Sequence, residues 1–196
     1  MLEMSDEEWE KIVKPLMPEF RKVAQIFIDN IDGYEPIWRQ VEPVLRERAE
    51  RWNDKFDKSN IVQEWERITG KTFMKDRYYI ILCYANKNGP NANSLSYDMN
   101  VFYYGSSDGY IRDLVSHEVG THLLSELLFK LREFDPVRYA ALECLAMFYN
   151  LKVLKSERLS YTLSQFQCDK FLPLYDKHYY RGINPERLME LALKER

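Results

Sequence analysis

Residues 111–132 read Ile-Arg-Asp-Leu-Val-Ser-His-Glu-Val-Gly-Thr-His-Leu-Leu-Ser-Glu-Leu-Leu-Phe-Lys-Leu-Arg. The stretch has no proline, and it predicts one long helix. Asp135-Pro136 follows as a helix cap and a first-turn proline, which predicts a second helix over residues 137–155. Because the connection is short, we expect the two helices to form an antiparallel hairpin around which the rest of the chain folds.

A small sheet is expected before this hairpin. Residues 78–84 are continuously β-branched and aromatic, as in a buried strand. Residues 94–104 predict a second strand, at or near the edge of the sheet. Further helices are expected over residues 18–31, from Pro36 with Pro43 kinking or splitting it, over a short segment that Gly70 ends, from Ser160, and from Asn184. The fold class is therefore α+β in a single domain (1–196), with a helical part (1–70) before the sheet and the hairpin (71–196).

Composition excludes several classes of protein. With 196 residues, 45% of them hydrophobic, the chain can bury a sizeable core. Its 28 basic residues are outnumbered by 31 acidic ones, so binding to nucleic acid through bulk charge is not expected. No stretch of about 18 residues lacks charge, so no membrane span is expected. Three cysteines and an acidic N-terminus suit a cytoplasmic protein without a disulfide framework.

The pair His117 and His122, with Glu118 beside the first, is the strongest sign of chemistry. Two histidines near an acid are typical of zinc sites. On a regular α-helix, residues five apart diverge by roughly 140°, so the two rings would not share a metal. A π-turn would align them, and Gly120 would lower the steric cost of that irregular backbone. The alternative is an amphipathic core helix with two satisfied histidines.

A catalytic zinc needs a third protein ligand and an open position for water. Glu143 is the best candidate, because an acid among apolar residues needs a buried partner and the hairpin brings it level with His122. Cys144 is the rival ligand. The alternative for Glu143 is a salt bridge to Arg112 or Arg138.

Glu118 can reach a metal-bound water without being a ligand. A metal lowers the pKa of that water, and Glu118 would accept its proton as general base. The resulting hydroxide would attack a polarised carbonyl, whose developing negative charge needs a hydrogen-bond donor. His178, Tyr179 and Tyr180 are the candidate donors.

The motif His-Glu-Val-Gly-Thr-His, followed by Glu143-Cys144-Leu145-Ala146, resembles a family of metallopeptidases. These are the tubulinyl-tyrosine carboxypeptidases and their bacterial relatives named for a Gln-Glu-Gly-Leu-Ala motif. The resemblance covers residues 116–182, and Tyr179-Tyr180-Arg181-Gly182 looks like the family's Tyr-Leu-Arg-Gly segment. Leu142 and Cys144 depart from the family's pattern. The resemblance implies His117, His122 and Glu143 as zinc ligands and Glu118 as base.

The sequence thus predicts a zinc-dependent metallopeptidase with a zincin-like, gluzincin-type domain. Its expected substrate is a peptide or protein, and the resemblance favours release of a C-terminal residue whose carboxylate Arg181 would grip. The strand expected over residues 94–104 could pair with an extended substrate. The alternative is a non-catalytic metal-binding or interaction module that retains the fold, although metal binding alone would not need Glu118.

Overall fold

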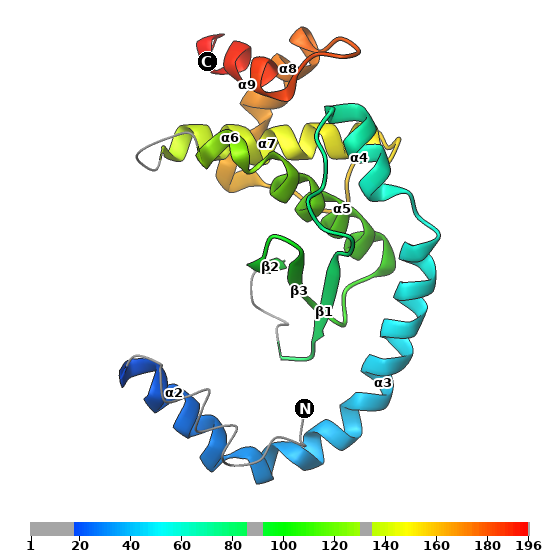
Figure 1. Cartoon of the computed structure of the whole chain (residues 1–196), viewed down its shortest axis with the longest axis vertical. Helices are drawn as coiled ribbons and strands as arrows, with labels where there is room; N and C mark the ends of the chain where they lie inside the picture. Colours follow the sequence, from blue (N-terminus) through cyan, green and yellow to red (C-terminus); the bar gives the residue numbers. More distant parts are fainter. Residues whose placement is uncertain (1–17, 86–91, 130–134, 196) are drawn as a thin grey trace. The chain divides into compact units, whose positions relative to one another are not determined.

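The computed structural model describes residues 18–85, 92–129 and 135–195. Contacts between residues group the chain into two compact units, residues 1–47 and residues 48–196. We refer to them as unit 1 and unit 2, and Figure 1 labels their helices and strands. The elements are mostly helical with one small sheet, which confirms the α+β class.

The described part of unit 1 consists of α2 (Pro18–Asp29) and of α3 (Ile31–Asp57) as far as residue 47. The helix expected from Pro36 in fact begins at Ile31, and it continues through Gly33 and both prolines. Of the two expected effects of Pro43, a kink or a split, the split is therefore wrong. Pro36 and Pro43 are solvent-exposed, so the backbone carbonyls that lose a partner at each proline can be hydrated.

Unit 2 opens with the end of α3 and with α4 (Ile61–Thr69). Gly70 ends α4 in the left-handed conformation (φ 68°), and its N–H donates to the carbonyl of Glu66. The prediction that Gly70 ends this helix is confirmed. Glycine suits the position because a residue without Cβ adopts this conformation without steric cost.

The sheet has three strands, β1 (Tyr79–Cys83), β2 (Ala92–Ser96) and β3 (Met99–Tyr103), in the order β1-β3-β2. The strand predicted over 78–84 is confirmed as β1, which pairs in parallel with β3. The single strand expected over 94–104 is in fact the antiparallel pair β2 and β3. The chain reverses between them at Tyr97 and Asp98, where the Ser96 hydroxyl donates to the Asp98 carboxylate at 2.8 Å. Consequently β2 forms an edge and β3 is the central strand.

The long helix expected over 111–132 is α5 (Asp108–Leu124) followed by α6 (Glu126–Phe129). It starts earlier than expected, because the Ser107 side chain caps it by accepting from the N–H of Tyr110. At Ser125 the N–H donates to the carbonyl of His122, three residues back, and α5 ends there. The expected end at Arg132 lies outside the described residues.

The second hairpin helix is α7 (Pro136–Val153), and its predicted cap is confirmed: the Asp135 carboxylate accepts from the N–H groups of Val137 and Arg138. A short 3-10 turn (Ser164–Phe166), α8 (Cys168–His178) and α9 (Pro185–Glu195) follow. The helix start at Asn184 is confirmed, whereas that at Ser160 is wrong. Ser160 instead bonds Asp113 through its N–H (2.8 Å) and its hydroxyl (2.7 Å), which holds this loop against α5.

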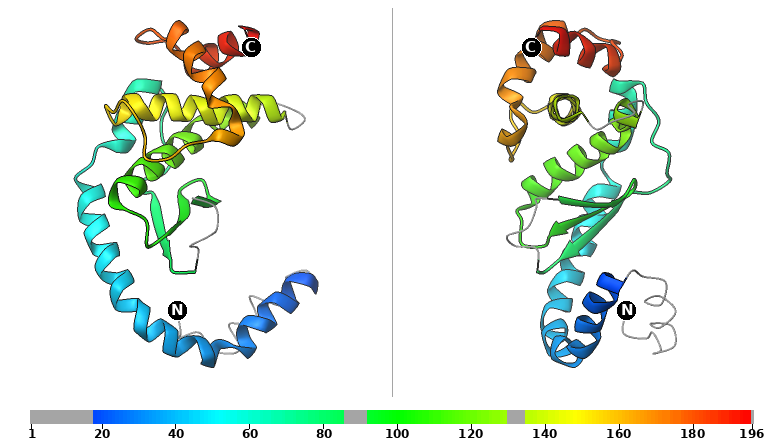
Figure 2. Two further views of the ribbon diagram at one scale, coloured as in Figure 1. Left: turned by 180° about the vertical axis from the view of Figure 1, so that it is seen from behind. Right: turned by 90° about the vertical axis from the view of Figure 1, so that its left-hand side faces the viewer.

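The core of unit 2 is arranged around α7. Figures 1 and 2 show α5 on one side of α7 with the sheet beyond it, and α8 and α9 on the other side. The largest fully buried side chains are contributed by α4, β3, α7 and α8, and they are Trp65, Phe102, Tyr149, Phe171 and Tyr175. None of the helices in the described ranges has the length and apolar character needed to cross a lipid bilayer.

One expectation about the cysteines needs correction. Cys144 on α7 and Cys168 at the start of α8 form a disulfide, with 5.1 Å between their Cα atoms. Both residues are buried, and Cys83 remains as a free thiol. The sequence did not indicate this pairing, because the loop after α7 determines which cysteines meet. The disulfide joins two helices that pack on each other in the core.

Candidate metal centre

The hairpin of α5 and α7 brings His117 against Glu143. The Nε2 of His117 lies 3.1 Å from Oε2 of Glu143, and the His117 side chain is almost fully buried. Tyr139, one turn before Glu143, also hydrogen-bonds its carboxylate. Glu143 thus contacts neither of the two arginines considered as alternatives: Arg112 instead binds Asp113 at 2.6 Å.

His122 faces the sheet. Its Nε2 lies 2.8 Å from Oδ1 of Asn100 on β3 and 3.5 Å from the Ser94 hydroxyl on β2. Burial lowers the pKa of His122 below its ordinary value, which favours the neutral imidazole that could bind a metal.

Asn100 also holds Glu118. Its Nδ2 donates to Oε2 of Glu118 at 2.8 Å and to the Ser94 hydroxyl at 3.0 Å, while the Tyr78 hydroxyl donates to its Oδ1 at 2.8 Å. Asn100 is completely buried. Burial raises the pKa of the Glu118 carboxyl above its ordinary value, and the neighbouring Glu143 carboxylate raises it further. Glu118 and His122 are therefore bridged by one amide side chain.

The expected π-turn is absent from α5, which is α-helical at every residue from 108 to 124. As expected for a regular helix, the two histidines then face different neighbours: His117 faces α7 and His122 faces the sheet. In the described part of the chain, no three His, Cys, Asp or Glu side chains are grouped closely enough to hold a metal ion.

The donor set nevertheless fits zinc in one respect. Two ligands with bonds of about 2.0–2.2 Å in a tetrahedral site lie about 3.4 Å apart, close to the 3.1 Å between His117 Nε2 and Glu143 Oε2. The charge of Glu143 also raises the pKa of His122, so that ring lies within electrostatic reach of the pair. Because α5 is a regular α-helix, two imidazoles and a carboxylate could meet on one ion only if α5 opened into the π-turn and His122 left Asn100.

Gly120 has a different role from the one expected. A Cβ built on it would lie 2.2 Å from the indole ring of Trp65 on α4. The Trp65 Nε1 donates to the Ser116 hydroxyl at 3.0 Å, so the ring lies directly on α5. The glycine is required here for close packing of two helices and not for an irregular backbone.

Several residues around the centre were not found from the sequence. Tyr161 packs its ring edge-on to His117 at 5.3 Å between ring centroids, and its hydroxyl accepts from Asn150 at 3.1 Å. Tyr139 contacts Glu143, Asn100 contacts Glu118, and Tyr78 contacts Asn100, as described above. The rival ligand Cys144 is paired with Cys168 in the disulfide.

The C-terminal candidates lie elsewhere, around the end of α8. The Nε2 of His178 lies 2.7 Å from Oε1 of Glu195, and Tyr179 packs on Phe148. Tyr180 is 63% exposed, and Arg181 is exposed in the turn that follows. This end of α8 lies across α7 from the sheet (Figure 2). The structure therefore does not bring His178, Tyr180 or Arg181 to the centre formed by α5 and α7.

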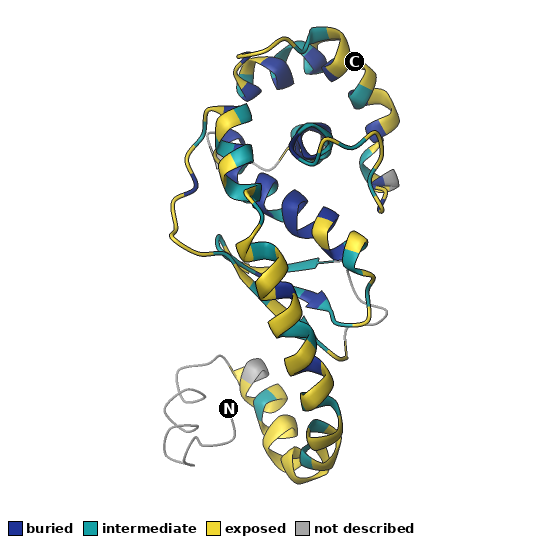
Figure 3. Cartoon of the chain, turned by 90° about the vertical axis from the view of Figure 1, so that its right-hand side faces the viewer, coloured by how far each residue is buried: buried dark blue, intermediate teal, exposed yellow. Residues whose placement is uncertain are grey.

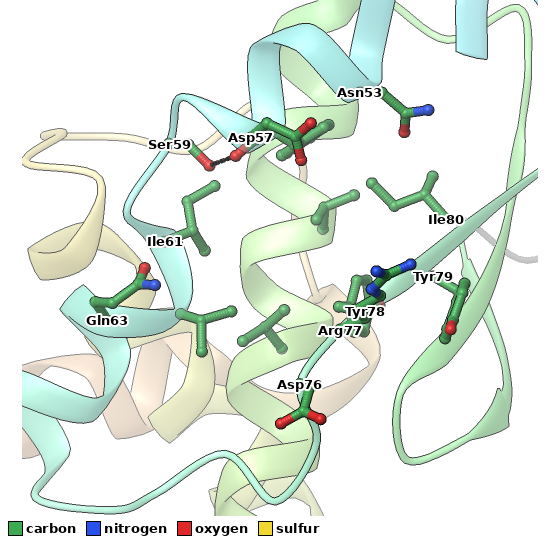
Figure 4. A pocket seen from close by; sticks show the side chains of 14 residues that line it. Asn53, Asp57, Ser59, Ile61, Gln63, Asp76, Arg77, Tyr78, Tyr79 and Ile80 are labelled. Atoms are coloured by element: carbon green, nitrogen blue, oxygen red, sulfur yellow. Dashed lines mark hydrogen bonds between the residues drawn. The ribbon is translucent and has the colours of Figure 1, made fainter. Parts of the chain in front are cut away.

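A separate cavity of about 710 Å³ lies between the end of α3, α4, the start of β1 and α5 (Figure 4). Apolar side chains such as Val62 and Val115 line it together with the polar groups Asp57 and Arg77. Among the lining residues, Tyr78 donates to Asn100 and Ile80 is paired with Asn100 across the sheet. None of the expected ligands or catalytic residues lines this cavity, so it is not the candidate centre.

Comparison of the chain with protein-family models, with curated proteins and with solved structures finds no match. The likeness to the tubulinyl-tyrosine carboxypeptidases consequently rests on the motif residues alone.

Proposed function

We propose that the chain is a zinc-dependent metallopeptidase of the zincin-like, gluzincin type, with His117, His122 and Glu143 as ligands. One observation carries the proposal. His117 and Glu143 contact each other at 3.1 Å, and the charge of Glu143 also shifts the pKa of both Glu118 and His122. His117, Glu118 and His122 lie on α5 and Glu143 lies on α7, and ligation by both histidines would require α5 to open into a π-turn.

Zinc bound there would polarise a substrate carbonyl and lower the pKa of a coordinated water. The chain's own groups would do the rest. Glu118 would accept the proton of the attacking water, and the buried Asn100 amide fixes the direction of the Glu118 carboxylate. Tyr139 and Tyr161 are nearer to the centre than Tyr180 and are better placed to donate to developing negative charge.

The edge strand β2 offers a place for an extended peptide. Its Ser94 lies beside His122, and β3 is already paired on both sides. A substrate strand added to β2 would therefore run next to the candidate centre. Of the strand expected over residues 94–104, only the first part, which belongs to β2, would therefore pair with a substrate strand.

The test compares zinc content and peptide hydrolysis in the parent chain and in three variants. Glu118→Gln should retain stoichiometric zinc and lose about 10²–10⁴-fold in kcat, because it keeps the volume and removes the proton acceptor. Glu143→Gln should weaken zinc binding, because it removes an anionic ligand. Glu126→Gln is the control, since that exposed carboxylate on α6 contacts Lys71 and none of the centre. Peptides with free and amidated C-termini would test the expected preference for a free carboxylate.

The alternative is a non-catalytic metal-binding or interaction module with the same fold. The observation that favours it is the 2.8 Å contact between His122 and Asn100, which engages an expected ligand within the protein. Stoichiometric zinc without hydrolysis of any peptide would support that module. Absence of stoichiometric zinc from the parent would exclude the peptidase.

A further inference from the structure

The side chain of Asn100 lies between Glu118 and His122 and is completely buried. It belongs to β3, the central strand, which is paired on both sides. Figure 3 shows many buried residues on α5, the helix that carries Glu118 and His122. A polar side chain in such a place needs hydrogen-bond partners within the protein, because bulk water does not reach it.

The Asn100 amide uses its full hydrogen-bonding capacity. Its Nδ2 carries two protons, which are donated to Oε2 of Glu118 at 2.8 Å and to the Ser94 hydroxyl at 3.0 Å. Its Oδ1 has two lone pairs, which face the Tyr78 hydroxyl and Nε2 of His122, both at 2.8 Å. The Glu118 carboxylate selects this orientation, because a reversed amide would set Oδ1 against another acceptor oxygen.

These contacts determine which nitrogen of His122 carries a proton. An amide oxygen can only accept, so Nε2 of His122 donates to Oδ1 of Asn100. The Ser94 hydroxyl lies 3.5 Å from the same Nε2, but it donates its own proton to the Glu118 carboxylate. Both oxygens near Nε2 therefore present lone pairs to it. The neutral ring consequently has its proton on Nε2 and its own lone pair on Nδ1.

The consequence for catalysis rests on the proposed function, whereas the hydrogen bonds do not. A metal binds an imidazole nitrogen through its lone pair, so Nε2 of His122 is blocked while it donates to Asn100. Glu118 can act as a base only with its carboxylate directed at the attacking water. We propose that Asn100 is a positioning residue that orients the Glu118 carboxylate through Nδ2 and holds His122 as the Nε2–H tautomer through Oδ1.

The first test measures the metal-free parent chain. It has three histidines, so nitrogen NMR can resolve each imidazole, and loss of a signal in His122→Gln assigns that ring. We expect His122 as a single Nε2–H tautomer whose ring proton exchanges slowly with water, because that proton is engaged by Asn100. A proton on Nδ1, or a mixture of both tautomers with rapid exchange, would overturn the proposal.

Two substitutions of Asn100 separate its two roles. Ionised aspartate has acceptor oxygens and no donor, so Asn100→Asp should keep the protected Nε2–H of His122 and lose the bond to Glu118. Asn100→Leu should lose both, and His122 should then show both tautomers. Asn53→Leu is the matched control, because it makes the same change at an exposed position on α3. Equal loss of the protected proton in both Asn100 variants would show a loosened fold and would contradict the proposal.

Peptide hydrolysis tests the role of Nδ2. Both Asn100 variants should lower kcat about 10–100-fold with little change in KM, because each removes the donor that directs Glu118. An unchanged kcat in Asn100→Asp would contradict this role. Zinc titration separates the inference from the proposed function, since bound zinc should remove the protected proton of His122. A parent that binds no zinc would refute the proposed function, whereas the tautomer of His122 would still decide the role of Asn100.

Discussion

The exposed helices of unit 1 and the buried helices of unit 2 carry opposite patterns. α2 has one apolar and one polar face, and its apolar face is exposed. α7 is apolar almost all round, and both α5 and α7 bury many of their residues, including a few polar ones that each have a partner. Asn150 on α7, for example, donates to the backbone carbonyl of Asp113 on α5 at 2.8 Å.

This difference teaches what each pattern can predict. An all-round apolar helix specifies that it lies in an interior, and its buried polar groups then need partners in fixed directions. A one-sided helix specifies only that a face is to be covered, and it does not say by what. The functional centre of unit 2 is consequently built from directed contacts, whereas unit 1 presents a surface.

Matched truncations in the two units should give the largest difference. Leu145 is completely buried on α7, and Phe27 is 70% exposed on α2. Leu145→Ala should lower the free energy of unfolding by about 2–5 kcal/mol, because it opens a cavity in the core. Phe27→Ala should change it by no more than about 0.5 kcal/mol in the dilute monomer. Urea denaturation measures both, and equal losses would mean that α2 is packed in the monomer.

Alanine substitutions at two glycines should change the free energy of unfolding by smaller amounts, and with opposite signs. Gly120→Ala would place a Cβ 2.2 Å from the Trp65 ring, so overpacking should cost about 2–3 kcal/mol of unfolding free energy. Gly33 lies in α3 with no atom within 4 Å of an added Cβ. Gly33→Ala should therefore stabilise the chain by about 0.5–1 kcal/mol through reduced backbone entropy of the unfolded state. A stabilising Gly120→Ala would show that Trp65 moves freely.

The parts of the fold that local chemistry determines could be predicted from the sequence. The caps at Asp135 and Gly70 and the strand β1 are specified by the residues themselves. The turn at residues 97–98 was missed, because the surrounding residues alternate as a single strand would. Ser160 looked like a helix cap, but its hydroxyl bonds the distant Asp113, which no local pattern reveals.

The candidate site likewise has features that the sequence predicted and features that it did not. The sequence placed Glu143 level with His122 in the helical hairpin, whereas its carboxylate contacts His117, so the pairing of the two helices was predicted and their register was not. The role of Asn100 could not be predicted, since it depends on which strand lies beside α5. Arg181 was chosen from a loose motif and His178 only as one of three candidate donors, and the end of α8 lies across α7 from the sheet.

The smallest expected effect concerns charge. In unit 2, Asp108 at the start of α5 binds Arg51 at 3.1 Å and Lys55, both on α3, whereas Arg39 of unit 1 pairs with Glu35 one turn away. A hydrogen bond from Lys55, and a second from Trp52, lower the pKa of Asp108 from 3.8 to about 2. The folded chain therefore favours ionised Asp108, so this stabilisation is present above about pH 4 and is lost as the pH falls toward 2. Because the side chain is 37% exposed, Asp108→Asn should cost less than about 1 kcal/mol at pH 7. The difference in unfolding free energy between the parent and Asp108→Asn, measured by urea denaturation, should shrink between pH 4 and pH 2. Glu35→Gln should lose less unfolding free energy than Asp108→Asn. A difference that stays constant with pH would assign the effect of Asp108 to packing and not to its charge.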